Sequence, residues 1–213
     1  MNKRILILGA TSGIGRLAME EALMRGHTVR AFARSADELE ARPGLEAFAG
    51  DALSADDVAA ALDDVEAVVY ALGIKESVAM LWKEETLFSA STKVLLEEMA
   101  QAGVKRLIAV TGFGAGRSQA SMSKIERLGH RLILGKPYAD KDRQEMSIMK
   151  SDADWTIVRP VILTNATKAG KYRVLREPSQ WRNGLISRSD VAHYLVDAFE
   201  SESDIRTDVV LAR

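Results

Sequence analysis

The sequence contains no cysteine and only three histidines among its 213 residues. The absence of cysteine excludes disulfide bonds, thiol catalysis and thiolate metal ligands. The histidines, His27, His130 and His193, are scattered and lack the spacing of a metal site. We therefore expect a protein without a bound metal whose fold does not depend on disulfide bonds.

Neither a large net charge nor a long apolar run is present. The chain has 29 basic and 30 acidic residues, a formal net charge of -1, which gives no electrostatic reason to expect nucleic acid or an anionic membrane as a partner. No apolar run approaches the roughly 20 residues of a membrane span. The first predicted strand begins at Arg4, which leaves no room for a signal peptide. We expect a cytoplasmic monomer or small homo-oligomer that binds small molecules.

What is present is a regular alternation of apolar runs and helical patterns. Strands are predicted over 4–8, 28–33, 45–49, 67–71, 106–110, 155–158 and 208–211, and helices over 16–24, 54–62, 85–102, 138–151 and 189–200. Short connections between alternating strands and helices are typical of a parallel sheet. We expect an α/β Rossmann fold, a doubly wound and mostly parallel sheet with helices on both faces, as a single domain over 1–213.

A glycine-rich turn joins the first predicted strand to the first helix. It reads Gly9-Ala10-Thr11-Ser12-Gly13-Ile14-Gly15. Gly9 would allow the tight turn, Gly13 would let the backbone approach a pyrophosphate, and Gly15 would let the helix pack close to the sheet. The helix N-terminus then offers N–H groups and a positive dipole end to phosphates. The turn predicts a dinucleotide site; the alternative is a tight turn with no ligand.

The end of the second strand distinguishes between the two nicotinamide dinucleotides. An acidic residue there favours NAD, and an arginine accommodates the 2′-phosphate of NADP. This chain has Arg34-Ser35 at that point. A guanidinium suits a phosphate, and Ser35 can add a hydroxyl donor. NADP(H) is the predicted cofactor; alternatively, Arg34 is a solvated residue beside Asp37 and Glu38.

The remaining cofactor contacts are expected just after the other strands, where ligands bind in open parallel sheets. The candidates are Asp51 and Ala52 after the third strand, Ala71, Leu72 and Gly73 after the fourth, Thr111 and Gly112 after the fifth, and Pro160 and Val161 after the sixth. The Asp51 carboxylate could accept a hydrogen bond from the adenine amino group. The small residues 71–73 would leave room for the adenosine.

Several of these motifs together resemble a known family. They are Gly9-Ala10-Thr11 with Gly15, Arg34, Gly50-Asp51, the run Asp154–Pro160 and the late run Ile186–Ala192. In this order they are similar to the atypical short-chain dehydrogenase/reductases, and within them to the NmrA-like NAD(P)-binding group that includes biliverdin/flavin reductases. The resemblance spans the chain. It implies a Rossmann fold, a preference for NADP and hydride transfer to flavins, quinones or linear tetrapyrroles, although some members bind the nucleotide without obvious turnover.

The catalytic residues of the standard short-chain enzymes are not all matched. Their Y-x-x-x-K spacing is broken, because Tyr138 lies three residues before Lys141 and Pro137 lies four before it. Both spacings share a helix face, so Tyr138 and Lys141 remain a candidate pair. Lys141 matches the family's lysine before an acidic position, here Glu145, and could hold the nicotinamide ribose; alternatively, it is a solvated residue paired with Glu145.

Thr111 follows the fifth strand, where the family usually has Ser or Thr facing the nicotinamide. Its hydroxyl could hold the carboxamide or the reacting group; the alternative is a turn hydroxyl. The substrate wall is expected from 74–87 with Trp82, from 113–138 with Phe113, and from 164–181. The aromatic residues Phe113 and Trp82 could stack on a planar ring.

Two functions remain open at this point. The first is an NADPH-dependent reductase that transfers hydride to a planar conjugated small-molecule acceptor, with the protein mainly orienting the reactants. The alternative is a non-catalytic NADP(H)-binding redox sensor that regulates a protein partner, which the broken Y-x-x-x-K spacing would favour. A nucleotide-sugar epimerase is less well matched, because it usually needs the intact pair and a larger C-terminal region.

Overall fold

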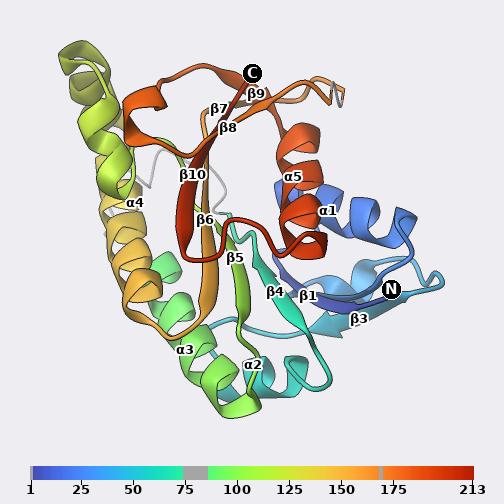
Figure 1. Cartoon of the computed structure of the whole chain (residues 1–213). Helices are drawn as coiled ribbons and strands as arrows, with labels where there is room; N and C mark the ends of the chain where they lie inside the picture. Colours follow the sequence, from blue (N-terminus) through green and yellow to red (C-terminus); the bar gives the residue numbers. More distant parts are fainter. Residues whose placement is uncertain (1, 74–85, 168–169) are drawn as a thin grey trace.

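The computed structural model describes the backbone of residues 2–73, 86–167 and 170–213, and their side chains except at 124–126 and 128–136. Eight strands form one sheet in the order β3-β2-β1-β4-β5-β6-β10-β8 (Figure 1). Its strands are β1 (Arg4–Leu8), β2 (Thr28–Ala33), β3 (Leu45–Ala49), β4 (Ala67–Tyr70), β5 (Arg106–Val110), β6 (Asp154–Pro160), β8 (Arg173–Leu175) and β10 (Thr207–Ala212). All neighbouring strands are parallel except β8, which pairs antiparallel with β10.

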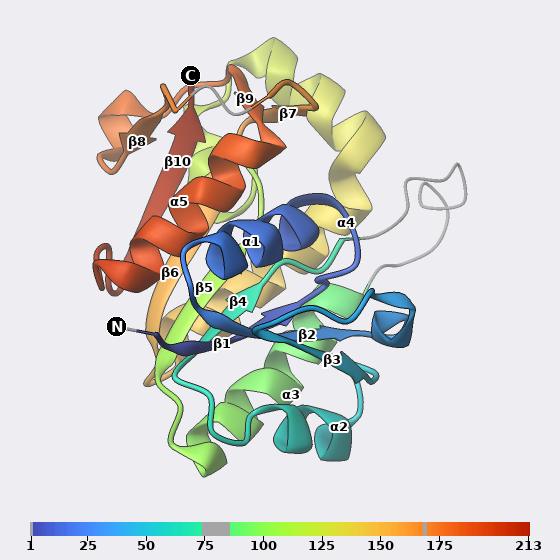
Figure 2. The same ribbon diagram turned by 90° about the vertical axis from the view of Figure 1, so that its right-hand side faces the viewer.

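Helices cover both faces of this sheet. They are α1 (Gly13–Met24), α2 (Ala55–Ala61), α3 (Leu87–Ala102), α4 (Lys124–Lys150) and α5 (Arg188–Glu200), with short 3-10 helices at Ala36–Glu38, Gly116–Ser121 and Pro178–Gln180. Figure 2 shows α1 on one side of β1 to β3 and α2 and α3 on the other. The predicted doubly wound, mostly parallel sheet is confirmed.

The sequence of β1 explains the two layers. All four residues Ile5–Leu8 are at most 1% exposed, as a strand covered on both faces requires. Ile5 and Ile7 belong to the apolar cluster beneath α1 and α5, and Leu6 and Leu8 to the cluster beneath α2 and α3. Alternate side chains of one strand therefore contribute to two cores, which lie on opposite faces of the sheet.

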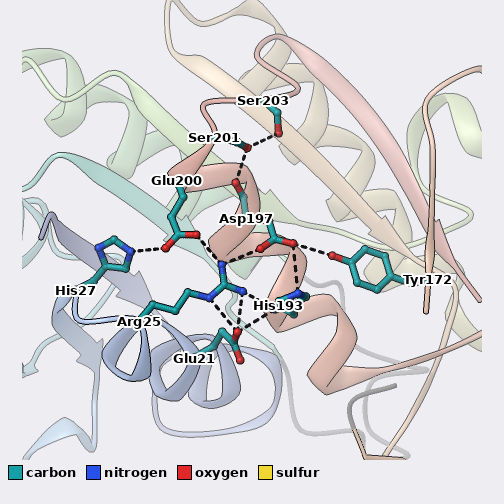
Figure 3. Close-up of polar contacts among 9 residues, drawn as sticks. All are labelled: Glu21, Arg25, His27, Tyr172, His193, Asp197, Glu200, Ser201 and Ser203. Carbon is teal, nitrogen blue, oxygen red and sulfur yellow. Dashed lines mark hydrogen bonds and ion pairs between the residues drawn. The ribbon is translucent and has the colours of Figure 1, made fainter. Parts of the chain in front are cut away.

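Helices α1 and α5 are joined by a charged cluster at the end of α1 (Figure 3). The Arg25 guanidinium lies 2.7 Å from Glu21, 2.8 Å from Asp197 and 2.7 Å from Glu200. His193 contacts both Glu21 and Asp197. The cluster fixes the register of the two helices whose N-termini face the same edge of the sheet.

Helix α4 differs from its prediction. It begins at Lys124 rather than near 138, and it continues through Pro137. Proline ends most helices because it lacks an N–H donor and crowds the preceding turn, at a cost of about 3 kcal/mol. Here α4 packs along α3, and its buried Asp140 accepts hydrogen bonds from the backbone N–H groups of Phe88 and Ser89 at 2.8 and 3.3 Å. Tertiary contacts of this kind outweigh the local preference.

Three short strands were not predicted. Strand β7 (Ile162–Thr164) pairs with β9 (Leu185–Ser187) in a separate two-stranded sheet, and β8 extends the main sheet. Each has three residues, too few to produce a periodic signal. Among the described residues, no helix is both long and apolar enough to cross a membrane.

Candidate functional site

A cavity of about 580 Å³ lies at the carboxyl ends of β1, β4, β5 and β6. This is the edge where the strand order reverses, between β1 and β4, and where open α/β sheets bind ligands. Of the predicted residues it is lined by Ser12, Gly13, Ile14, Ala71, Leu72, Gly73, Thr111, Gly112, Tyr138, Lys141, Pro160 and Val161. The fold therefore gathers the ends of five segments that are far apart in sequence.

The glycine turn shows why its spacing is needed. Gly9 has φ +83°, and a Cβ there would lie 2.7 Å from the carbonyl oxygen of Ala71. A Cβ on Gly15 would collide with the carbonyl oxygen of Gly9. Only glycine at both positions lets the start of α1 pack directly on the turn and on the end of β4. Gly9, Gly15 and Thr11 are themselves outside the cavity lining and shape the turn from behind.

The cavity side of the same turn has room for a phosphate group. Gly13 and Gly73 both line the cavity, and a Cβ added to either meets no atom within 4 Å. The Ser12 side chain does not cap α1, and the first turn of α1 carries no acidic residue. The N-terminus of α1 thus presents its N–H groups and positive dipole end to the cavity without a competing side chain. These residues fit a dinucleotide pyrophosphate.

The other predicted adenosine contacts lie beyond the cavity lining. Arg34 is exposed at the end of β2 and forms no ion pair or hydrogen bond with another described residue, and Ser35 is half-buried beside it. The Asp51 carboxylate accepts a hydrogen bond from the Leu53 N–H at 3.0 Å, within its own turn. Ala52 is 7% exposed and packs in the core beneath α2, so its side chain serves packing.

Thr111 is held at three points at the end of β5. Its N–H donates to the carbonyl oxygen of Val158 at 2.9 Å, which extends the β5–β6 pairing past the strand end. Its carbonyl oxygen accepts from Lys141 Nζ at 2.5 Å. Its hydroxyl donates to Glu145 Oε1 at 2.7 Å. A hydroxyl has one proton, so Thr111 turns acceptor lone pairs, not a donor, toward the cavity.

Glu145 is itself part of a buried charge network beneath the site. Arg159 is fully buried and donates to both Glu145 oxygens, at 2.9 and 2.7 Å, and to Asp208 at 2.6 Å. Asp208 also pairs with Arg117. A Cβ on Gly116 would strike Glu145, so this glycine leaves space for the network. Arg159 thus fixes the position of Glu145, to which the Thr111 hydroxyl donates.

Lys141 and Tyr138 lie together, as the helix spacing predicts. The Lys141 Nζ lies 5.4 Å from the ring centre of Tyr138 and 5.1 Å from that of Phe88. A Cβ on Gly112 would be 2.6 Å from the Tyr138 hydroxyl, which therefore lies over the end of β5. The two candidate side chains and Thr111 share one corner of the cavity.

The acidities of the pair differ from those of the standard Tyr/Lys couple. Burial lowers the pKa of Lys141 to about 8, partly offset by the charge of Glu145. Burial also raises the pKa of Tyr138 to about 12, and Glu145 acts in the same direction. In the standard enzymes the lysine lowers the phenol pKa; here Tyr138 stays protonated at neutral pH.

Several lining residues were not foreseen individually. They are Phe88, Val110, Ile162, Leu163, Asn183 and Arg188, together with Met122 and Pro137 from the predicted wall segment 113–138. Phe113, predicted from the sequence as a candidate to stack on a planar ring, also lines the cavity. Ile162 and Leu163 reach the cavity through the unpredicted pairing of β7 with β9, so no local signal marks them. Trp82 and its segment 74–85 lie outside the described residues. Trp181, from the third wall segment, is buried in the core and does not line the cavity.

A family model described as NAD(P)H-binding matches residues 9–202. The chain belongs to the NAD(P)H-binding family. The predicted nicotinamide cofactor is thereby confirmed, since NADP(H) is one of the two cofactors that the family name covers. The match spans the glycine turn, every cavity-lining residue and α5.

Two proteins are similar to this chain in sequence. An uncharacterized chloroplastic protein of Arabidopsis thaliana is 28% identical over 223 residues, covering 99% of this chain and 77% of the relative. A 3 beta-hydroxysteroid dehydrogenase/Delta 5→4-isomerase of Mycobacterium tuberculosis is 32% identical over 191 residues, covering 85% of this chain. The matched region spans 48% of that longer enzyme.

A solved structure is similar over nearly its whole length. ChuY, an anaerobilin reductase from Escherichia coli O157:H7, has a TM-score of 0.80 and 25% sequence identity, covering 98% of this chain and 96% of ChuY. With the family match and the dehydrogenase relative, this similarity identifies the protein as an NAD(P)H-dependent oxidoreductase of the short-chain dehydrogenase/reductase type. The predicted enzyme class and family resemblance are confirmed.

Proposed function

We propose that this oxidoreductase transfers hydride from NADPH to a planar conjugated acceptor such as a flavin, a quinone or a linear tetrapyrrole. One observation carries the proposal: the cavity wall around Thr111 and Lys141 is largely apolar and includes three aromatic rings, Phe88, Phe113 and Tyr138. A planar ring system gains both burial and ring contacts against such a wall. The cavity volume of about 580 Å³ suits a ligand of that size.

The side chains at the reacting corner favour orientation over acid–base chemistry. When bound, the cofactor supplies the hydride. Thr111 accepts a hydrogen bond from the ligand, because its own proton goes to Glu145. Tyr138 is protonated at neutral pH and is a poor base. A conjugated acceptor can be reduced without a side-chain acid or base, because the hydride goes to an electron-poor centre and water can deliver the proton afterwards.

We also propose that NADPH is preferred over NADH through Arg34. Its guanidinium stands exposed at the end of β2 with no partner among the described residues, which leaves it available to the 2′-phosphate. The variant Arg34→Glu should weaken NADPH binding far more than NADH binding. An equal loss of both affinities would contradict the role of Arg34.

The similarity to ChuY supports the acceptor class. ChuY is an anaerobilin reductase, and its structure superimposes on this chain from end to end. The steroid dehydrogenase relative points elsewhere, to a secondary alcohol, but the matched region spans about half of that enzyme. Alcohol oxidation favours a tyrosine base with a lowered pKa, whereas burial raises the pKa of Tyr138 to about 12.

The test is a binding measurement followed by a turnover screen. Calorimetry with NADPH and with NADH should give tight binding of the first and weak binding of the second. NADPH oxidation, followed by absorbance, should then accelerate with riboflavin, menadione or a linear tetrapyrrole. Tight NADPH binding without turnover of any acceptor would contradict the proposal and favour a redox sensor. Oxidation of a 3β-hydroxysteroid alone would place the protein with the dehydrogenases.

A further inference from the structure

The charges on the cavity wall are unbalanced. Among the described lining residues there are two cations, Lys141 and Arg188, and no Asp or Glu. Lys141 lies at the corner formed by β5 and α4, where its amine is bound to the Thr111 carbonyl. Arg188 comes from a different wall, at the first residue of α5. Arg188 therefore lies apart from the corner of the cavity that holds Thr111, Tyr138 and Lys141.

Arg188 has no counter-ion among the described residues. Its Nη1 donates to the amide oxygen of Asn165 at 2.7 Å, and no described carboxylate lies within ion-pair distance. Arg25 and Arg159, in contrast, contact three and two carboxylates. The buried Arg106 also forms no ion pair with a described carboxylate, but three carbonyl oxygens and a threonine hydroxyl accept its hydrogen bonds. Arg188 is half-buried at the cavity wall, held by a neutral amide that leaves most of its five donors open.

The surface beside Arg188 is apolar. Ile162 and Leu185 are direct partners in the β7–β9 pair, and they are 57% and 56% exposed. Leu163, next along β7, lines the cavity together with Ile162. We call Ile162, Leu163 and Leu185 the β7–β9 ledge. Exposed large apolar side chains such as Ile162 and Leu185 often mark a binding surface, and Ile162 also lines the cavity.

We propose that Arg188 and the β7–β9 ledge form an acceptor subsite for a planar molecule that carries an anionic oxygen group, a carboxylate or a phosphate. The ring system lies along the ledge, and the guanidinium takes the oxyanion through paired N–H donors. The subsite rests on the proposed reductase function and adds a charge requirement to it. The cofactor's phosphates have other expected partners, the N-terminus of α1 and Arg34, so they leave Arg188 to the acceptor.

The test uses pairs of acceptors that differ by one anionic group. Riboflavin and FMN differ by a phosphate, and menadione and a carboxylate derivative of the same naphthoquinone differ by a carboxylate. Equilibrium binding of each is measured by calorimetry on the full protein saturated with NADP⁺, which keeps FMN out of the cofactor site. We expect the wild type to bind one or both anionic members about tenfold more tightly than their neutral partners, a difference of about 1.4 kcal/mol.

Two variants identify the side chain responsible. Arg188→Met should reduce the anionic preference to near unity while leaving riboflavin, menadione and NADPH affinities unchanged. Arg182→Met is the matched control: Arg182 is an exposed arginine six residues earlier that does not line the cavity, and its loss should leave the preference intact. High salt should reduce the preference of the wild type and not that of Arg188→Met.

The outcomes separate this subsite from the proposed reaction. Equal affinity of the wild type for both members of each pair, or no binding of any of the four, overturns the subsite. A loss of NADPH affinity in Arg188→Met as large as the loss for FMN also overturns it, because the cation would then serve the cofactor. An anionic preference that depends on Arg188 supports the subsite even if no acceptor is reduced, in which case only the proposed hydride transfer fails.

Discussion

At the scale of single residues, Thr111 shows how a buried charge sets the polarity of a site. Glu145 accepts two hydrogen bonds from Arg159 and a third from the Thr111 hydroxyl. A threonine that must donate to a carboxylate can only accept from a ligand. The natural donor in a nicotinamide cofactor is the amino group of its carboxamide. An arrangement in which Thr111 protonates the acceptor would break its bond to Glu145.

This polarity predicts how the protein responds to a cofactor analogue. The 3-acetylpyridine analogue of NADP⁺ replaces the carboxamide amino group with a methyl group and cannot donate. Wild type should bind NADP⁺ about fivefold more tightly than the analogue, since one hydrogen bond contributes about 1 kcal/mol. In Thr111→Val this ratio should fall to near one, while Thr111→Ser should keep it. Calorimetric titrations check the prediction, and an unchanged ratio in Thr111→Val would contradict it.

Lys141 predicts a pH-dependent stability with a definite sign. Its pKa in the folded protein is about 8, below the ordinary 10.5, so the unfolded chain binds the proton more tightly. The buried ammonium therefore destabilises the fold below about pH 8, and the cost disappears as pH rises from 8 to 10.5. A shift of this size corresponds to about 3 kcal/mol, so Lys141→Met should raise the Tm of the cofactor-free protein by several degrees at pH 7 and by little at pH 10.5.

Thermal unfolding by circular dichroism at several pH values measures this difference. Comparing the variant with wild type at each pH removes the contribution of the tyrosines that lie away from Lys141. A Tm difference that is constant with pH would mean that Lys141 keeps an ordinary pKa.

At the scale of elements, two glycines near the ends of α1 allow the effect of backbone strain to be distinguished from the effect of ligand binding. Gly13 and Gly26 both have positive φ, +57° and +85°, and a Cβ on either meets no atom within 4 Å. Alanine at either position should cost about 1 kcal/mol of stability, because an L-residue is strained there. Only Gly13 lines the cavity; Gly26 lies at the other end of α1.

The two alanine variants should therefore lose similar amounts of Tm but differ in cofactor affinity. Gly13→Ala should weaken NADPH binding at least tenfold, because its methyl group occupies the space expected for the pyrophosphate. Gly26→Ala should bind NADPH like wild type. Calorimetry and thermal unfolding on the same samples check both statements. Equal NADPH affinity in the two variants would show that the α1 N-terminus does not hold the phosphates.

The elements also show where sequence patterns succeed. The apolar runs of β1, β4 and β5 and the Gly103 stop of α3 have local physical causes, and their predicted limits are close to those observed. For α4, the sequence predicts a helix over 138–151, whereas the observed helix begins at Lys124. The packing of α4 on α3 and the hydrogen bonds from the N-terminus of α3 to Asp140 stabilise the longer helix. Neither contact can be recognised from neighbouring residues in the sequence.

At the scale of the whole molecule, one sheet separates two apolar clusters. Trp181 lies in the cluster beneath α1 and α5, and Trp155 in the cluster beneath α2 and α3. Because strands β1, β4 and β5 each contribute side chains to both clusters, we expect the two clusters to unfold together. We propose that residues 1–213 form one cooperative unit.

This proposal predicts a single unfolding transition. In a Trp82→Phe background, Trp155→Phe leaves Trp181 as the reporter, and Trp181→Phe leaves Trp155. Each fluorescence transition in urea should coincide with the far-ultraviolet circular dichroism transition of the same variant. Two separated transitions in either variant would show that the clusters unfold independently and that the chain contains more than one unit.

The sequence by itself determined the chain's local chemistry: the glycine turn, the apolar strands, the arginine after β2, and the threonine and lysine of the reacting corner. Each depends on residues that are neighbours in the chain or follow a strand, so spacing is enough to find it. The tertiary structure decided what those groups can do. Glu145 sets the polarity of Thr111 from 34 residues away, and burial moves the pKa values of Lys141 and Tyr138 in opposite directions. Hydrogen-bond direction, burial and missing counter-ions depend on segments that meet only in the folded chain.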